Sequence, residues 1–203
     1  MKKGKSSSNY HHGDLKKALL DSGVSILAEQ GIKNLSLREA ARRAGVSHTA
    51  PYRHFEDKDA LLAAIAEEGF NRLILKLEEG IAKHPNNPLQ RHYAIGEAYV
   101  QFALENPNHL QVMFGNVLED YKKYSSLKQV SDKSFSLLVE TIKDCQKAGI
   151  VKKSNAIQLA LVAWSAIHGL SLLTIEKRNK WISENNSRII KILGDVLFNG
   201  MKA

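Results

Sequence analysis

Apolar residues recur every three or four positions along most of the chain, and no segment alternates convincingly between apolar and polar residues. The first clear run carries Leu15, Leu19, Ile26 and Leu27, and it ends at Gly31. A spacing near 3.6 residues is typical of a helix with one buried face, and glycine is a common helix terminator. The pattern therefore predicts an all-α protein without a sheet.

A helix-turn-helix is predicted between Ser36 and Phe55. Ser36 followed three residues later by Glu39 forms a capping box, in which each side chain satisfies a backbone N–H at the start of a helix. This short helix should end at Gly45, and Ser47 should cap a second helix that reaches Phe55. Two short helices joined by a glycine-containing turn are typical of this motif, although an ordinary helical corner has the same shape.

Helices should also fill the rest of the chain. Proline and glycine positions divide the apolar periodicity into segments. The expected helices cover residues 58 to about 84, 89–105, 110–114, 122–147, about 154–176 and about 185–199. The chain thus combines a unit of short helices near its start with a larger helical body.

Positive charge is concentrated in the first quarter of the chain. The 203 residues carry a formal net charge of +8, and residues 1–55 contribute +6 of it, with ten Lys or Arg against four Asp or Glu. This asymmetry is typical of a polyanion-binding segment joined to a nearly neutral body. The composition excludes collagen-like, mucin-like and disulfide-scaffold proteins, and the single cysteine, Cys145, fits a reducing cytoplasm.

One apolar segment has the length of a membrane span. Residues 156–175 contain no Asp, Glu, Lys or Arg, and a helix of about twenty residues would cross a bilayer. Ser165 and His168 are among the polar residues that interrupt the segment, and no second segment resembles it. A helix buried in a core or in a subunit interface is therefore favoured over a membrane helix.

Residues 35–47 read LSLREAARRAGVS, and residues 52–62 read YRHFEDKDALL. Together they resemble the DNA-binding domain of the tetracycline-repressor (TetR) family, and the resemblance covers about residues 12–65. Trp164 to Gly169, WSAIHG, resembles the Trp-x-x-x-His-Gly element of one C-terminal domain type in that family. Ala50-Pro51 departs from the family, in which a small or glycine-containing pair is more usual.

The resemblance implies DNA contacts for individual residues. Ser36, Arg38 and Lys58 would meet phosphates, while His48 and Thr49 would approach base edges. Their hydroxyl, imidazole and cationic groups all hydrogen-bond to bases or phosphates in protein–DNA complexes. The full set of implied DNA-binding residues is Ser36, Arg38, Ser47, His48, Thr49, Tyr52, Arg53, His54 and Lys58.

The resemblance also implies a partner and a ligand. A TetR-like chain would form a homodimer through its last two helices and bind a palindromic double-stranded operator, with recognition helices about 34 Å apart. An unknown small-molecule effector would bind among the middle helices, where aromatic and methionine side chains are typical of pockets and of cores alike. The candidate pocket residues are Tyr99, Phe102, Met113, Phe114, Trp164 and His168.

These observations predict a transcriptional regulator, most simply a repressor that a small molecule releases from its operator. The expected division is a disordered basic arm (1–11), a helix-turn-helix DNA-binding domain (12–57) and a helical effector-binding and dimerisation domain (58–203). We expect it in the cytoplasm, without membrane, metal or other cofactor, since no zinc-ligand spacing or phosphate loop occurs. The alternatives are a helical homodimeric interaction module and a small helical enzyme, although the sequence contains no recognisable catalytic motif.

Overall fold

Helices account for most of the structure, a computed structural model that describes residues 12–176 and 186–202. The α-helices are α1 (His12–Gln30), α2 (Leu37–Arg43), α3 (Lys58–Ala82), α4 (Pro88–Glu105), α5 (Pro107–Phe114), α6 (Ser125–Lys147), α7 (Ala156–Ile175) and α9 (Asn186–Met201). Short 3-10 helices are η1 (Ile32–Asn34), η2 (Ala50–Arg53) and η3 (Tyr121–Lys123). These ranges contain no strand beyond one isolated antiparallel bridge, Val151 with Lys202, so the all-α prediction is confirmed.

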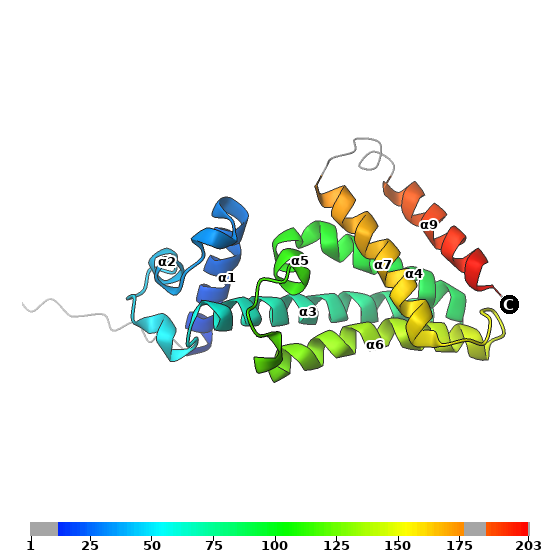
Figure 1. Cartoon of the computed structure of the whole chain (residues 1–203), viewed down its shortest axis with the longest axis horizontal. Helices are drawn as coiled ribbons and strands as arrows, with labels where there is room; N and C mark the ends of the chain where they lie inside the picture. Colours follow the sequence, from blue (N-terminus) through cyan, green and yellow to red (C-terminus); the bar gives the residue numbers. More distant parts are fainter. Residues whose placement is uncertain (1–11, 177–185, 203) are drawn as a thin grey trace, which may run out of the picture.

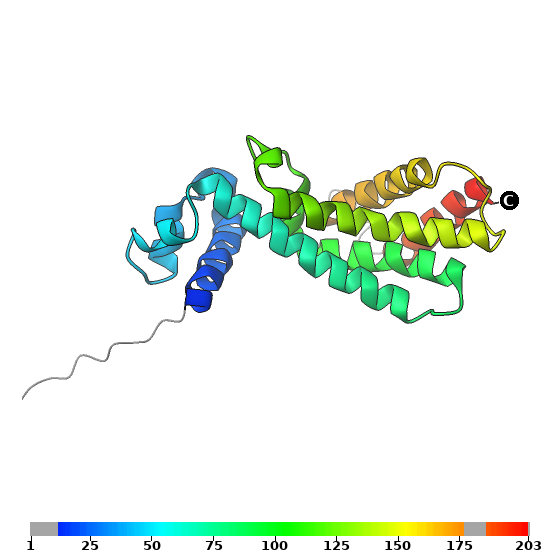
Figure 2. The ribbon, with the colours of Figure 1, turned by 90° about the horizontal axis from the view of Figure 1, so that it is seen from below.

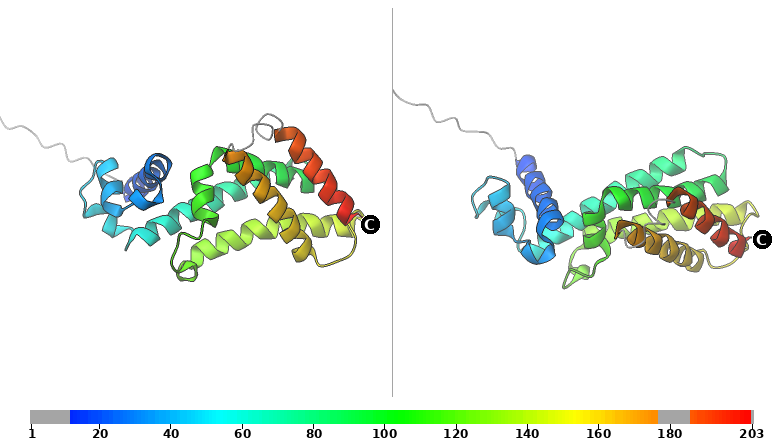
Figure 3. Two further views of the ribbon diagram at one scale, coloured as in Figure 1. Left: turned by 45° about the horizontal axis from the view of Figure 1, so that its top comes forward. Right: turned by 90° about the horizontal axis from the view of Figure 1, so that it is seen from above.

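Helix α3 is the central element of the molecule. It runs from the small N-terminal unit of α1, α2 and η2 into the larger body, where α4, α5 and α6 pack along it (Figure 1). In the view from below, α3 and α6 run beside each other along the body (Figure 2). Helices α7 and α9 form an outer layer that contacts α4 (Figure 3). Helix α3 therefore belongs to both parts of the fold.

One apolar core continues from the N-terminal unit into the body. Leu19 and Ile26 of α1 are fully buried, and Phe55 is almost fully buried, in the cluster that also holds the first turns of α3. Gly23 allows α1 to approach α3 closely, because a Cβ at this position would lie 2.9 Å from Ile65 Cδ1. The N-terminal unit is thus held on α3 by packed side chains, each contributing about 1.5–3 kcal/mol when fully buried.

The second helix of the predicted helix-turn-helix differs from the sequence expectation. We expected a helix capped by Ser47, but the chain makes a turn through Thr49 and then forms only the 3-10 helix η2. The reason is Pro51, which has no N–H to donate to the Ser47 carbonyl as an α-helix would require. The N–H of Ala50 donates to that carbonyl instead, at 3.0 Å, and Ser47 Oγ lies 3.1 Å from Thr49 Oγ1.

Several helix boundaries differ from the predictions by a few residues. Helix α1 begins at His12, three residues before Leu15, the first apolar residue of the predicted run. Helix α5 begins at Pro107, because proline fits the first helical position, where an N–H would have no partner in the helix. Helix α6 begins after η3 rather than at Lys122. The predicted arm, residues 1–11, lies outside the described residues.

Candidate nucleic-acid interface and ligand cavity

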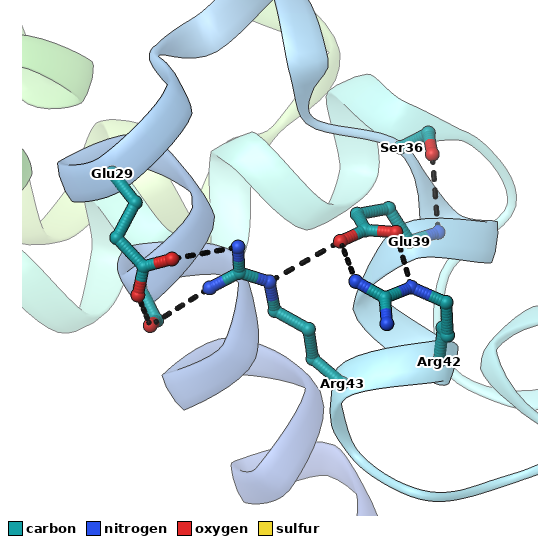
Figure 4. Close-up of polar contacts among 6 residues, drawn as sticks. Glu29, Ser36, Glu39, Arg42 and Arg43 are labelled. Carbon is teal, nitrogen blue, oxygen red and sulfur yellow. Dashed lines mark hydrogen bonds and ion pairs between the residues drawn. The ribbon is translucent and has the colours of Figure 1, made fainter.

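A ladder of polar contacts fixes α2 against α1. Ser36 Oγ accepts a hydrogen bond from the Glu39 N–H at 3.1 Å, which is one half of the predicted capping box. The Glu39 carboxylate does not complete the box in the expected way: it accepts from Arg42 at 2.6 Å and from Arg43 at 3.2 Å (Figure 4). Arg43 also pairs with Glu29 of α1 at 2.8 Å. The hydrogen bond from Arg42 is the main cause that lowers the pKa of Glu39 to about 2.

Gly45 makes the turn between α2 and η2. Its φ is +69°, a left-handed conformation that side chains with a Cβ adopt at a cost. The N–H of the following Val46 donates to the Ala41 carbonyl at 3.1 Å, which closes the end of α2. The glycine therefore sets the direction in which the chain leaves α2 toward η2.

Polar side chains are exposed along this unit. Arg38 extends from the first turn of α2, and His48 and Thr49 lie in the turn before η2. Tyr52 and Arg53 belong to η2 itself, and the aromatic Tyr52 is 55% exposed. A cationic, hydroxyl-bearing and aromatic surface on two short packed elements has the chemistry of a nucleic-acid interface.

The helical body contains a cavity of about 710 Å³. Its walls come from α3, α4, α6, α7 and α9 and from the last residue of α5. Aromatic rings form a connected part of the wall. The ring centroid of Phe114 lies 5.5 Å from those of Phe70 and Trp164, and the centroid of Phe135 lies 6.2 Å from that of Trp164. A volume of about 300–1,000 Å³ with apolar walls and few polar groups is typical of a small-molecule site.

The N-terminal unit and the body each match a known family. Residues 19–65 match the family of bacterial regulatory proteins called the tetR family. Residues 93–197 match the family of tetracyclin repressor-like C-terminal domains. The chain belongs to the TetR family. It is a DNA-binding transcriptional regulator of the helix-turn-helix type.

Curated relatives and solved structures agree with this assignment. The uncharacterized HTH-type transcriptional regulator YvkB of Bacillus subtilis (strain 168) is 24% identical over 194 residues, which cover 92% of this chain and 97% of the relative. A protein with unknown function from Rhodococcus sp. RHA1 is 33% identical, with a TM-score of 0.82 over 97% of this chain and 100% of that one. The TetR family regulator PfmR from Thermus thermophilus shares the fold, with a TM-score of 0.71, 16% identity, and coverage of 91% and 99%.

The structure places most of the regulator's predicted DNA-binding residues at the surface. Ser36, whose Oγ caps α2, and Ser47 are exposed together with the polar side chains described above. His54 differs, because it is half-buried beside Phe55, with the two ring centroids 6.3 Å apart. Lys58 is only partly exposed, and its Nζ already donates a hydrogen bond to the Ile32 carbonyl at 2.8 Å. The DNA contacts of all these residues stay predictions.

The six predicted effector residues separate into three groups. Tyr99, Phe114 and Trp164 line the regulator's cavity. Phe102 and Met113 do not line it: they are buried in the core, 1% and 6% exposed. His168 lies behind the wall, where its Nδ1 is 2.7 Å from Tyr99 Oη.

Some cavity residues were missed by the sequence prediction. His92 lines the cavity from α4, seven residues before Tyr99 and therefore on the same helical face. Phe135 of α6 and Leu193 of α9 line it as well. The spacing on α4 was a usable signal for His92, but the contribution of α9 depends on how the helices pack.

Three polar side chains beside the cavity, those of His92, His168 and Tyr99, are neutral near pH 7. Burial lowers the pKa of His92 to about 4, and burial also lowers the pKa of His168 below its usual value. Burial raises the pKa of the Tyr99 hydroxyl above its usual range. Trp164 Nε1 donates to Tyr99 Oη at 3.4 Å, so this hydroxyl joins the indole to the His168 imidazole.

Within residues 12–176 and 186–202, no group of three or more His, Cys, Asp or Glu side chains could hold a metal ion. Cys145 is fully buried, and its burial raises the pKa of the thiol. A buried cysteine with a raised pKa lacks the thiolate character of a nucleophile.

Proposed function

We propose that the regulator is a repressor that leaves its operator when a small molecule occupies the cavity. The course of α3 carries this proposal. Lys58, the first residue of α3, lies beside the helix-turn-helix, and Phe70, Leu73 and Leu77 of the same helix line the cavity. A helix shifts as a rigid element, so movement of the cavity segment would be transmitted to the N-terminal unit.

Helix α5 supports the same coupling. Phe114 ends this helix at the cavity, where its ring lies 4.9 Å from the His168 ring, and α5 also packs on α1 and α3. A ligand that displaces Phe114 would therefore act on both helices that hold the helix-turn-helix. An effector that favours the released state by about 3 kcal/mol would lower operator affinity by about 150-fold.

We propose that two copies pair through α7 and α9. Helices α7 and α9 share a surface of exposed apolar side chains. Such a surface marks an interaction site, and a two-fold four-helix contact would bury it. Ser165 and Gly169 lie within the surface, and a Cβ built at Gly169 meets no atom within 4 Å, which leaves room for close approach. The exposed apolar residues are Ile157, Leu161, Val162, Leu172 and Leu173 of α7 and Ile192 and Val196 of α9.

Helix α7 is long and apolar enough to cross a bilayer by length and composition. However, its opposite face carries Ala160, Ala163, Leu170 and Ser171, which are buried in the body that α4 and α6 form with it. A helix with one face packed and one apolar face exposed suits a subunit interface. We therefore assign the exposed face to the homodimer and the protein to the cytoplasm.

The dimer would present two helix-turn-helix units to a palindromic operator, about 34 Å apart. His48, Thr49 and Tyr52 would approach bases or backbone from the turn and η2, and Arg38 would meet a phosphate. Lys58 would do the same, because its ammonium has three N–H donors and the Ile32 carbonyl uses one of them.

The test is binding of the full-length protein to the DNA upstream of its own gene. Fluorescence anisotropy at about 50 and 200 mM salt should show a specific complex with a dissociation constant of about 10⁻⁸ M or lower and a steep salt dependence. A shuffled duplex of the same composition is the control. A helical interaction module or a small enzyme would show no preference between the two duplexes, and that result would overturn the proposal.

A further inference from the structure

His92 and Ser134 line the cavity, and the hydrogen-bond donor of each is already used inside the protein. Thr141 Oγ1 donates its one hydrogen to the Leu138 carbonyl at 2.8 Å, so it accepts from His92 Nδ1, 3.1 Å away. The neutral His92 ring has a single N–H, which leaves Nε2 as an acceptor. Ser134 Oγ likewise donates to the Ser131 carbonyl at 2.7 Å and retains only lone pairs. His92 and Ser134 therefore offer acceptors to a ligand.

The charged side chains around the cavity also favour one class of ligand. The carboxylates of Glu97, Asp132 and Asp195 belong to its lining, although that of Asp132 is already paired with Lys128, which is outside the lining. Among the lining residues that the structure describes, Lys191 is the one Lys or Arg. All four charged residues of the lining are exposed and so lie where the cavity meets solvent. Asp195 accepts from the Tyr93 hydroxyl at 3.1 Å, which places its charge beside an aromatic ring. A ligand anion would be repelled at this rim, whereas a cation would be attracted.

Aromatic rings complete the site. Trp164, Phe135 and Tyr93 line the cavity, and a cation near the face of such a ring is attracted to it, most strongly with tryptophan. The rest of the wall is largely aliphatic and would pack against a flat or bulky apolar body. The cavity of about 710 Å³ is large enough for a molecule of several fused rings.

We propose that the cavity selects a protonated amine attached to an apolar, ring-containing body. This inference rests on the proposed function, since it names the chemical class of the effector. The amine supplies the positive charge that the rim favours and the N–H donors that the acceptors of His92 and Ser134 require. A neutral ring system would fill the same space without these contacts, and a carboxylate would bring the wrong charge and no donor.

Three fluorescent anthracenes test the head group with the body held constant: 9-(aminomethyl)anthracene, 9-anthracenemethanol and 9-anthracenecarboxylate. Each is titrated with the full-length protein at pH 7, and binding is followed by anisotropy. The amine should bind about tenfold or more tighter than the carboxylate, with the alcohol between them. A carboxylate that binds as tightly as the amine, or the absence of any binding, would overturn the inference.

Variants then locate the source of the preference. The double variant Glu97→Gln, Asp195→Asn removes two rim charges while keeping the shape of both side chains. It should weaken amine binding about three- to tenfold and leave alcohol binding unchanged. Glu79→Gln is the matched control, because Glu79 is an exposed carboxylate of α3 outside the cavity lining. Equal losses for amine and alcohol, or no loss for either, would contradict the charge-based selection.

Operator release distinguishes this inference from the proposed function. If the carboxylate bound most tightly and released DNA, the amine class would be wrong while the ligand-released regulator would stand. If the amine bound most tightly and the protein remained on its operator, the preference of the cavity would stand and the proposed release mechanism would be wrong.

Discussion

Filling the cavity from its own wall gives a direct test of the ligand site. Gly96 lines the cavity on α4, and a Cβ built there meets no atom within 4 Å. It lies four residues after His92 and three before Tyr99, both cavity residues, so a side chain at position 96 would point into the same space. The variants Gly96→Ala and Gly96→Phe differ only in how far they extend into it.

The two variants should separate stability from binding. Gly96→Ala should stabilise the protein by about 0.5–1 kcal/mol, because glycine costs conformational entropy inside a helix. This gain corresponds to a rise in Tm of about 1–4 °C for a chain of this size. Gly96→Phe should fold with similar stability, since burying an aromatic side chain contributes about 1.5–3 kcal/mol. Its ring should nevertheless weaken binding of 9-(aminomethyl)anthracene by about tenfold or more through lost space.

The measurements are a thermal melt followed by circular dichroism and an anisotropy titration on the same preparations. Gly96→Ala serves as the control for binding, and it should retain affinity within about twofold. Wild-type affinity in Gly96→Phe would refute the assignment of this cavity as the ligand site. A lower Tm for Gly96→Ala would show that the space beside this position is not open.

Other expectations concern the helix-turn-helix and the dimer. Lys58→Ala should weaken binding to all DNA sequences alike and reduce the salt slope by about one, measured by anisotropy at several salt concentrations. Gly45→Ala should lower the free energy of unfolding by about 1–2 kcal/mol in a urea titration, because its φ is +69°. The folded-state pKa of Glu39, about 2, lies below its ordinary value of 4.5. Its carboxylate therefore stabilises the native state above about pH 4.5, and this contribution is lost as pH falls toward 2. Glu39→Gln should show a shallower loss of stability in acid melts. Leu161→Glu should convert dimers to monomers in sedimentation velocity, whereas Leu75→Glu, an exposed leucine of α3 outside the proposed interface, should not.

Much of the fold was predictable because its local signals agree with one another. The apolar period of α1, the serine cap of α2 and the glycine of the following turn each depend on neighbouring residues alone. The failure at the second helix was also local: an α-helix capped by Ser47 needs an N–H at position 51, and Pro51 has none.

The details of the candidate sites depend on contacts between distant residues. Phe102 and Tyr99 are three residues apart on α4, yet only Tyr99 lines the cavity. Lys58 donates to the carbonyl of Ile32, a backbone atom 26 residues away, which no side-chain pattern reveals. Residue type was enough to select aromatic candidates, but which of them face the cavity depends on how α9 and α7 cover α4.

Release of operator DNA by a bound cavity ligand tests the coupling through α3 most directly. Labelled operator is titrated with full-length protein, first alone and then with a saturating concentration of the tightest-binding anthracene, and the anisotropy gives both affinities. A ligand that shifts the equilibrium by about 1.4 kcal/mol or more would weaken operator binding at least about tenfold, which is the result we expect. Unchanged operator affinity with the cavity demonstrably occupied would contradict the account.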